Sequence, residues 1–423
     1  MRKSKNYSVS FFKLAVLYGS KFIGAIAGFV FMPIYLRLMG AEDFSIVAVI
    51  TSLQAFALIF DFGVLTTVGR DLAVVGSKLK DRLRLLLSAE GALIFLYFVG
   101  GAVLIAGLAL LHWSNSKVFM NFGVLILLLG VILQALHGTA LISLSRYYEG
   151  ALCNTFMVVL RSIGTWIVIR YLSPSIEAFV FAQALFSVVG ALVSRIYSMR
   201  HLQADALTTF CRENFSISNC VQVVKKSRAL IVSSLVGAAA TQLDKTILLG
   251  HVGAEELSAY FLAHSISSMP LAIVATPIVQ YFQPKVIALH DQVSNPAKSS
   301  VFRQFGVCIV LSMAAMALFF STFGHALIDL WLTDKNIARL VMDYVDLLVI
   351  AYLVAGVGYI PYVMMIAGRG YAFNAKLAVV AAVGLLGAVF VAAIQSSVEM
   401  ACFAFIGYYG VVTAGLFFRM FRN

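Results

Sequence analysis

Charged side chains within long apolar stretches are the residues of this sequence that could do chemistry. Four bases stand in such surroundings, namely Lys13, Lys21, Arg161 and Lys245. Among the acids in similar surroundings we single out three, namely Asp61, Glu90 and Asp244. A charge near the centre of a bilayer costs roughly 2.5–3.5 kcal/mol on insertion scales, so it normally faces water or the interior of a helix bundle. Bases placed there can bind an anionic cargo, and acids can carry a coupling ion.

The bases also have structural interpretations. Lys13 and Lys21 belong to the first apolar stretch, where a lysine can extend its ammonium group to the cytoplasmic interface. Lys21 shares a helix face with Gly24 and Gly28, a small-residue pattern that also serves close helix packing. Arg161 lies near the middle of its stretch, so we expect it to face a cavity or cargo, with a buried ion pair as the alternative.

The acids divide in a similar way. Asp61 and Glu90 lie in the cytoplasmic third of adjacent predicted helices, where pairing with Arg70 or a first-helix lysine competes with a transport role. Asp244 shares a helix face with small and polar residues and is expected to line a cavity; these residues are Gly237, Ala240 and Thr241. We predict ion coupling or gating by Asp61, Glu90, Asp244 and Arg70.

Two histidines and two prolines complete the candidate set. His137 and His264 could carry protons because an unperturbed histidine titrates near ~6.5, but we expect both to be structural. Pro270 and Pro277 fall within one predicted span, and each removes a backbone hydrogen bond. The sequence therefore predicts a kinked eighth helix with a hinge role for the two prolines.

The composition decides which elements can position these residues. The chain has 423 residues, of which 61% are hydrophobic and 12% charged, whereas soluble proteins average roughly 45–50% apolar and about 25% charged residues. A water-soluble fold has too little interior to bury so much apolar surface. A cytosolic enzyme, a nucleic-acid-binding domain and a disordered chain are therefore poor interpretations.

A membrane helix needs about 20 apolar residues. By this measure we predict an all-α membrane protein with about twelve transmembrane helices. The predicted spans are 12–36, 44–67, 85–111, 118–142, 150–170, 178–198, 229–249, 257–282, 304–332, 341–366, 375–394 and 398–418.

The net charge of +12 is explained by the orientation of the chain in the membrane. Most basic residues outside the spans fall on the side of the N-terminus, including the start of the chain and the 199–228 loop. The opposite side holds five, namely Arg37, Lys117, Arg170, Lys335 and Arg339. Under the positive-inside rule both termini are cytoplasmic. The basic charge thus requires no nucleic-acid partner.

The loops disfavour catalysis. The predicted outer loops are all short, so no soluble catalytic domain fits there, and a membrane enzyme of glycan assembly is a weak alternative. The sequence contains no G-x-x-x-x-G-K-[ST] phosphate loop and no His-Glu-x-x-His zinc motif. We therefore expect a transporter rather than an enzyme, with no cofactor and no metal.

The 199–228 loop divides the spans into six and six. A weak repeat supports this division, because Gly40-Ala41-Glu42-Asp43 and Gly253-Ala254-Glu255-Glu256 follow the first span of each half. We predict an N-terminal six-helix lobe (1–205), a cytoplasmic linker (206–228) and a C-terminal six-helix lobe (229–423). Transporters with such halves place the cargo between them.

Three segments resemble a known family. They are Pro33-Ile34-Tyr35-Leu36-Arg37-Leu38-Met39-Gly40; Phe60-Asp61-Phe62-Gly63 followed by Arg70 and Ala73; and Leu243-Asp244-Lys245 followed by Gly250, Gly253 and Tyr260. These segments are similar to motifs of the polysaccharide-transporter branch of the multidrug/oligosaccharidyl-lipid/polysaccharide exporter superfamily. The resemblance is to Wzx-type flippases for lipid-linked O-antigen units.

The resemblance implies two six-helix bundles around a central cavity. It implies flipping of an undecaprenyl-diphosphate-linked oligosaccharide between the leaflets of the bacterial inner membrane, with proton or sodium coupling. Its implied partners are this lipid-linked substrate, membrane lipids and other glycan-assembly membrane proteins. Cavity cations would suit the diphosphate, and the candidates are Lys21, Arg161, Lys245 and Lys13.

Two other transporter types remain open at this stage. A drug or cation antiporter of the same superfamily would use the intramembrane acids to bind its cargo. A major-facilitator transporter also has twelve spans and cytoplasmic termini. In that family the loop after the second helix reads G-x-x-x-D-R, whereas Gly76 and Asp81-Arg82 are one residue out of register here.

Overall fold

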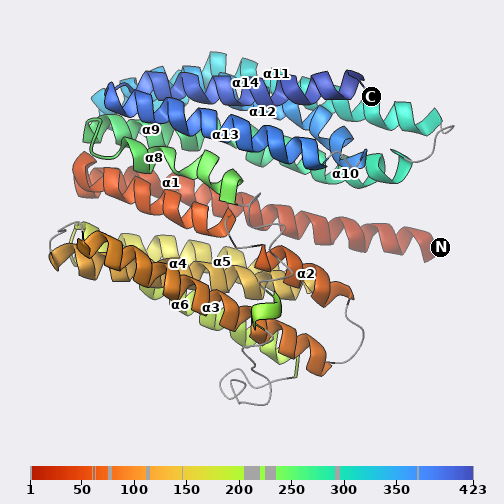
Figure 1. Cartoon of the computed structure of the whole chain (residues 1–423), viewed down its shortest axis with the longest axis horizontal. Coiled ribbons are helices and arrows are strands. Elements are labelled where there is room, and N and C mark those ends of the chain that lie inside the picture. Colours follow the sequence, from red (N-terminus) through yellow and green to blue (C-terminus); the bar gives the residue numbers. More distant parts are fainter. Residues whose placement is uncertain are drawn as a thin grey trace. The chain divides into compact units, whose positions relative to one another are not determined.

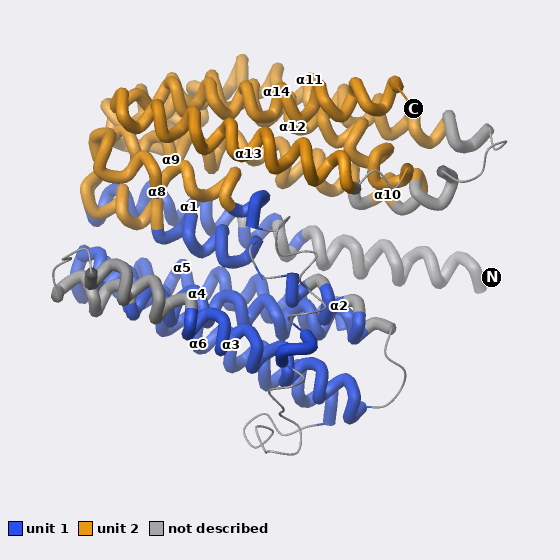
Figure 2. The backbone as a smooth tube through the Cα atoms, viewed as in Figure 1, with its two compact units in different colours: residues 1–39, 50–238 blue, residues 40–49, 239–423 orange. Residues whose placement is uncertain are grey.

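The computed structural model of the chain describes residues 2–59, 61, 63–74, 79–110, 115–144, 146–203, 220–223, 235–290, 296–368 and 371–422. Every regular element in these ranges is helical, and none of them contains a strand (Figure 1). The chain forms two compact units, which Figure 2 colours separately. The N-terminal unit comprises Met1–Met39 and Ile50–Ala238, and the C-terminal unit comprises Gly40–Val49 and Ala239–Asn423.

The N-terminal unit is built around a central helix, α4. Its elements are α1 (Arg2–Ile59), α2 (Val64–Val74), α3 (Leu79–Leu110), α4 (Asn115–Ser143), α5 (Tyr147–Tyr171) and α6 (Ile176–His201). Helix α4 packs against α2, α3, α5 and α6. Small residues bring α4 and α6 close together: a Cβ at Gly130 would overlap Ser187, and one at Gly190 would meet Gln134.

The first helix is interrupted where the sequence predicts a turn between two spans. Gly40 has φ 80° and ψ 169°, a conformation open to glycine but unfavourable for residues with a Cβ. The predicted second span, 44–67, is not one continuous helix. It ends at Ile59 and restarts as α2 at Val64, with Gly63 at φ 68° between them.

The C-terminal unit contains α8 (Asp244–Leu248), α9 (Ala254–Ser267), the π-helix η1 (Pro270–Ala275), α10 (Thr276–His290), α11 (Pro296–Trp331), α12 (Lys335–Ala367), α13 (Tyr371–Ile394) and α14 (Val398–Arg422). Helix α12 packs against α9, α11 and α14. The segment Gly40–Val49 joins this unit: Ser258 Oγ donates to the Ala41 carbonyl over 3.1 Å, and the Phe44 and Phe261 rings meet edge to face at 6.0 Å.

The predicted eighth span, 257–282, is interrupted at its prolines. It consists of α9, the π-helical turn η1 that begins at Pro270, and α10, in which Pro277 is the second residue. Thr276 Oγ1 donates to the Leu271 carbonyl over 2.8 Å and so satisfies one carbonyl in the irregular turn. A hinge function for these prolines stays a prediction.

Nine helices among the described residues are long and apolar enough to cross a membrane. One of them, Phe22–Ile59, includes the Gly40 break and covers parts of two predicted spans. Two further predicted spans, 85–111 and 229–249, extend into residues outside the described ranges. The chain is thus a multi-pass membrane protein, while the count of twelve and the cytoplasmic side of the termini stay predictions.

Candidate functional site

Each unit contains a buried cluster of one acid, one base and one histidine. The C-terminal cluster is Asp244, Lys245, Tyr260, His264 and Tyr352. The N-terminal cluster is Glu90, His137, Arg195 and Ser198. Since buried charges are stable only when paired or hydrogen-bonded, the two clusters are the candidate sites of this fold.

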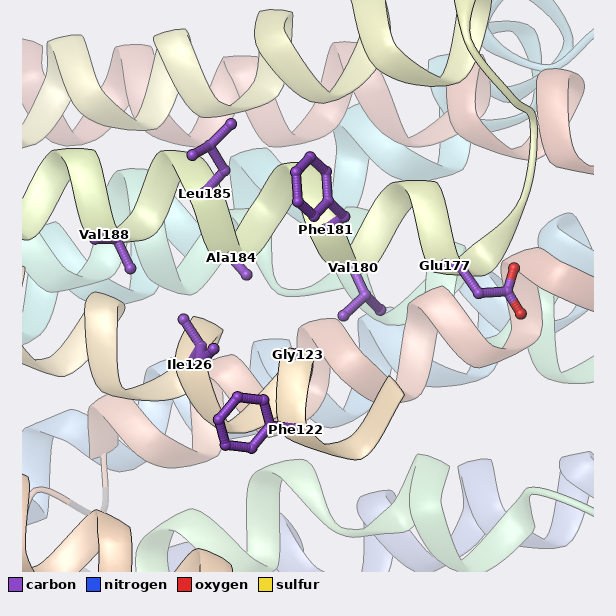
Figure 3. Close-up of a pocket in the computed structure, with 9 residues that line it drawn as sticks. All are labelled: Phe122, Gly123, Ile126, Glu177, Val180, Phe181, Ala184, Leu185 and Val188. Carbon is purple, nitrogen blue, oxygen red and sulfur yellow. The ribbon is translucent and has the colours of Figure 1, made fainter. Parts of the chain in front are cut away.

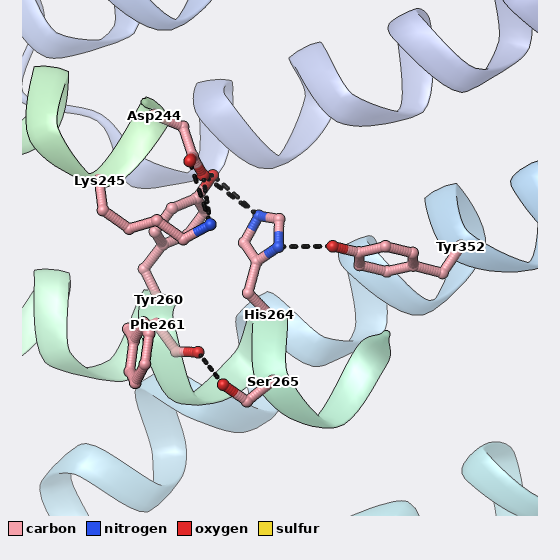
Figure 4. A network of polar contacts seen from close by, with 7 residues as sticks. All are labelled: Asp244, Lys245, Tyr260, Phe261, His264, Ser265 and Tyr352. Carbon is pink, nitrogen blue, oxygen red and sulfur yellow. Dashed lines mark hydrogen bonds and ion pairs between the residues drawn. The ribbon is translucent and has the colours of Figure 1, made fainter. Parts of the chain in front are cut away.

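The C-terminal cluster surrounds one carboxylate (Figure 4). Lys245 Nζ lies 3.0 Å from both oxygens of Asp244. The Tyr260 hydroxyl donates to Asp244 Oδ2 over 2.8 Å, and His264 Nε2 lies 3.5 Å from the same oxygen. Asp244 is fully buried and Lys245 is 4% exposed. The carboxylate therefore has its countercharge and a second donor without water.

The hydrogen bonds of this cluster define one neutral tautomer of His264. Tyr260 gives its only proton to Asp244, so its oxygen accepts from His264 Nε2–H over 3.0 Å. Nδ1 then keeps its lone pair and accepts from the Tyr352 hydroxyl at 2.7 Å. With a neutral histidine, both ring nitrogens and both hydroxyls have partners.

Three helices hold these residues in register. Asp244 and Lys245 open α8, Tyr260 and His264 stand one turn apart on α9, and Tyr352 comes from α12. The Lys245 ammonium lies 5.8 Å from the centre of the Tyr260 ring, within the range of a cation–π contact. The chain therefore fixes both the charges and the aromatic rings around them.

The N-terminal cluster links α3, α4 and α6. Arg195 Nε donates to Glu90 Oε1 over 2.7 Å, and His137 Nε2 lies 3.8 Å from the same oxygen. Ser198 Oγ lies 2.9 Å from His137 Nδ1 and donates to the Arg195 carbonyl over 3.0 Å. Among the described residues, neither Glu90 Oε2 nor His137 Nε2 has a hydrogen-bond partner, although both are buried.

Sequence reasoning identified only part of each cluster. It selected Glu90, Asp244 and Lys245 as charges in apolar stretches, but it did not single out Arg195. Arg195 lies inside the predicted span 178–198, and this position was the available signal. Tyr352 has no comparable signal, because a tyrosine in a membrane helix is common.

Arg161 and Asp61 lie outside both clusters. Arg161 stands half-buried in the middle of α5, and no ion pair among the described side chains involves it. The neighbouring Ser162 carbonyl accepts a hydrogen bond from Tyr35 over 2.8 Å. Asp61 accepts from the backbone N–H groups of Gly63 and Leu65 at 2.8 and 2.9 Å, so it orders the start of α2.

The other predicted site residues are placed only in part. The backbones of Lys13 and Lys21 belong to α1 and that of Arg70 to α2, but their side chains lie outside the described ones. Lys245, predicted as a cargo cation, has the buried carboxylate of Asp244 as its partner. Among the described residues, no group of three or more His, Cys, Asp or Glu could hold a metal ion.

An apolar groove of about 350 Å³ lies between α4 and α6 (Figure 3). Phe122 of α4 and Phe181, Leu185 and Val188 of α6 line it, and Glu177 at the start of α6 is its one charged lining residue. Among the described lining residues, the walls are apolar and include no cation.

Several solved structures share this fold. The chain is similar to a structure titled lipid II flippase MurJ in an inward closed conformation, with TM-score 0.76, 11% identity, and coverage of 97% of this chain and 87% of that one. It is also similar to a MATE transporter in complex with MaL6, with TM-score 0.66, 12% identity, and coverage of 97% of this chain and 95% of that one. A MOP superfamily transporter from Pyrococcus furiosus matches with TM-score 0.62, 13% identity, and coverage of 97% of this chain and 95% of that one.

The family follows from the sequence. Residues 12–284 match the model described as polysaccharide biosynthesis protein, so the chain belongs to this family. No curated protein sequence matches the chain significantly. The solved structures that share the fold are titled as a flippase and as transporters. The matched range includes every residue of the two clusters except Tyr352.

Proposed function

We propose that the chain is a flippase for an undecaprenyl-diphosphate-linked oligosaccharide of the O-antigen repeat-unit type. It moves this cargo from the cytoplasmic to the periplasmic leaflet of the bacterial inner membrane by alternating access. Membership of the polysaccharide biosynthesis family is the observation that carries the proposal. The fold is consistent with it, since a structure of the same fold is titled as a flippase of lipid II.

Arg161 is the first candidate for the diphosphate. It lies at mid-span in α5 and forms no ion pair with a described acid, so its guanidinium can bind phosphate oxygens. Lys13 and Lys21 are further candidates from α1. Lys245 ranks behind these three, because its binding of cargo would require release of the buried Asp244 carboxylate.

Ion coupling is proposed for the intramembrane acids. Glu90 is the first candidate because one of its buried oxygens is unpartnered. Asp244 is already saturated, and Asp61 orders the start of α2, so these acids and Arg70 come second as coupling or gating groups. An inward-negative potential supplies about 2.3 kcal/mol per charge per 100 mV.

A drug or cation antiporter is the second candidate function. The observation that favours it is the fold shared with MATE transporters. Such a transporter needs an acid that can bind a cationic cargo. If this function is correct, a strain that expresses the chain exports a cationic dye, and Asp61→Asn or Asp244→Asn abolishes the export.

A deletion strain of the host bacterium tests the main proposal. We expect complete undecaprenyl-linked repeat units to accumulate on the cytoplasmic leaflet while surface polysaccharide disappears. Wild type restores the polysaccharide, and Arg161→Ala at equal membrane level does not. Arg170→Ala is the matched control, because Arg170 is exposed in the last turn of the same helix.

The outcomes separate the function from the residue. Accumulation with full rescue by Arg161→Ala keeps the function and removes Arg161 from the cargo site. Normal surface glycan without accumulated lipid, in a strain with no second flippase, overturns the proposal and favours drug export.

A further inference from the structure

We infer that His137 is a proton-binding site of the N-terminal unit, and that a proton bound there competes with Arg195 for the Glu90 carboxylate. The site consists of His137 on α4, Glu90 on α3, and Arg195 and Ser198 on α6. The ligand is a proton from water. Its role as the coupling ion rests on the proposed flippase function, whereas its binding does not.

The first argument is the hydrogen bonding of Ser198. Its hydroxyl has one proton and two neighbours, the Arg195 carbonyl at 3.0 Å and His137 Nδ1 at 2.9 Å. A carbonyl can only accept, so when Ser198 donates to it, the hydroxyl oxygen accepts from Nδ1–H. In a neutral imidazole, Nε2 would then direct its lone pair toward the Glu90 carboxylate 3.8 Å away. A second proton on Nε2 replaces this repulsion with attraction.

The second argument is the unpartnered oxygen of Glu90. Its side chain is 4% exposed, that of His137 is 1% exposed, and Oε2 has no partner among the described residues. A carboxylate accepts up to four hydrogen bonds, and a buried charged oxygen without any is unfavourable. A doubly protonated His137, whose Nε2 lies 3.8 Å from Oε1, brings a second positive charge to this carboxylate beside that of Arg195.

The other groups around α4 do not provide this second charge. Helix α2 packs through Val64, Val68 and Leu72, and its Asp71 is half-buried. Helix α5 contributes Glu149, whose carboxylate lies 3.2 Å from His201, one turn beyond Ser198 on α6. Among the described side chains, the charged group that His137 Nε2 approaches is therefore Glu90, at the same oxygen that accepts from Arg195 Nε.

This shared oxygen suggests what the proton does. When His137 is neutral, Arg195 is the sole described cation on Glu90 and ties α6 to α3. When His137 is protonated, Glu90 faces two positive charges and holds Arg195 less tightly. Proton uptake thus weakens the ion pair that joins α3 and α6. A coupling ion must change the relative stability of two conformations, and weakening this ion pair would do so.

The test is nitrogen NMR of the full-length protein, labelled with 15N-histidine in lipid nanodiscs, from pH 8 to pH 5. Ser198→Ala assigns His137, because this substitution removes the partner of Nδ1 and shifts its signal. We expect the assigned ring to carry two protons at low pH. In Glu90→Gln, the doubly protonated fraction at pH 7 falls about tenfold or more, since the facing charge is lost.

The control is His325→Gln, which removes an exposed histidine of the C-terminal unit and leaves the His137 signal unchanged. The inference is overturned if His137 keeps a single proton across the range, as a neutral ring bridged to Glu90 by water would. It is also overturned if Glu90→Gln leaves the doubly protonated fraction unchanged. Should Glu90→Gln fail to fold, the wild-type titration still decides.

Transport in liposomes tests the coupling separately. A proton gradient is expected to accelerate flipping by wild type and not by His137→Gln. If no lipid-linked glycan is flipped while His137 still titrates, the proposed cargo is wrong and the proton site stands.

Discussion

The two buried clusters contain the same three kinds of group and differ in how completely they are satisfied. In the C-terminal cluster the acid and base are adjacent residues, and the Tyr260 hydroxyl and the His264 Nε2–H each have an acceptor. In the N-terminal cluster, Glu90 and Arg195 are 105 residues apart, and one oxygen of the Glu90 carboxylate has no hydrogen-bond partner among the described residues. Within the described part of the chain, the C-terminal cluster has no polar atom left free for a further ligand, whereas the Glu90 carboxylate has one. The types of residue alone therefore do not distinguish an ion pair that only stabilises the fold from one that can bind a ligand.

The largest effect is expected from breaking the saturated pair. Asp244→Asn or Lys245→Met leaves one buried charge alone and lowers the free energy of unfolding by about 3–5 kcal/mol. Thermal unfolding in detergent measures this loss. The double variant Asp244→Asn/Lys245→Met removes both charges and recovers most of it. If the double variant is as unstable as the single variants, the Asp244–Lys245 pair stabilises the fold beyond neutralising its own two buried charges.

The next effect depends on pH and separates the clusters. Arg195→Met removes the close cation from Glu90 and costs about 1.5–3 kcal/mol at pH 8. Between pH 8 and about 7 an unfolded histidine is mostly neutral. If a proton binds His137 of the folded protein in this range, as inferred above, it restores stability as the pH falls.

The double variant Arg195→Met/His137→Gln is the control for this pH dependence. It lacks both the close cation of Glu90 and the proton-binding ring, so its recovery of stability at lower pH should be smaller than that of Arg195→Met. Equal pH profiles for the two variants would contradict a role of His137 in the recovery.

A smaller loss is expected at the edge of the saturated cluster. Tyr352→Phe leaves His264 Nδ1 buried without a donor and lowers stability by about 1–3 kcal/mol. Tyr359→Phe, on the same helix and half-buried, is the matched control and should change stability by about 0.5 kcal/mol or less. If Tyr352→Phe changes the free energy of unfolding as little as Tyr359→Phe does, the hydroxyl of Tyr352 does not contribute to stability.

The smallest effect concerns an acid outside both clusters. Asp61→Ala removes the acceptor for two backbone N–H groups at the start of α2 and costs about 1 kcal/mol, whereas Asp61→Asn retains most of it. Thermal unfolding again measures the difference. If Asp61→Asn instead abolished transport without loss of stability, Asp61 would have a role beyond ordering the turn.

The sequence predicts the fold class and family of this protein well. Apolar stretches of membrane length and the motifs around Asp61 and Asp244 led to the all-helical membrane fold and to the family that the comparisons confirm. The broken second span was not predicted, because the region around Asp61 and Gly63 is as apolar as a helix. Its turn depends on a side-chain cap and a positive φ.

Residues of the candidate sites were predicted only where a single residue stands out from its sequence neighbours. Glu90 and Lys245 stand out because a charge in an apolar stretch is unfavourable in any packing. Arg195 and Tyr352 acquire their roles from helices distant in sequence, and hydropathy does not contain that pairing. Whether an acid is saturated also depends on three-dimensional packing, so ion coupling or gating was predicted for Asp244 and Glu90 alike.

The assignment of Gly40–Val49 to the C-terminal unit limits how this protein can be divided. A cut within 204–219 would leave that segment on the N-terminal fragment, away from the Ser258 and Phe261 side chains that contact it. The C-terminal fragment expressed alone would lack part of its own packing, and co-expression of both fragments would restore it. The two halves are therefore not interchangeable cassettes, and a chimera that exchanges them must carry the Gly40–Val49 segment with its C-terminal unit.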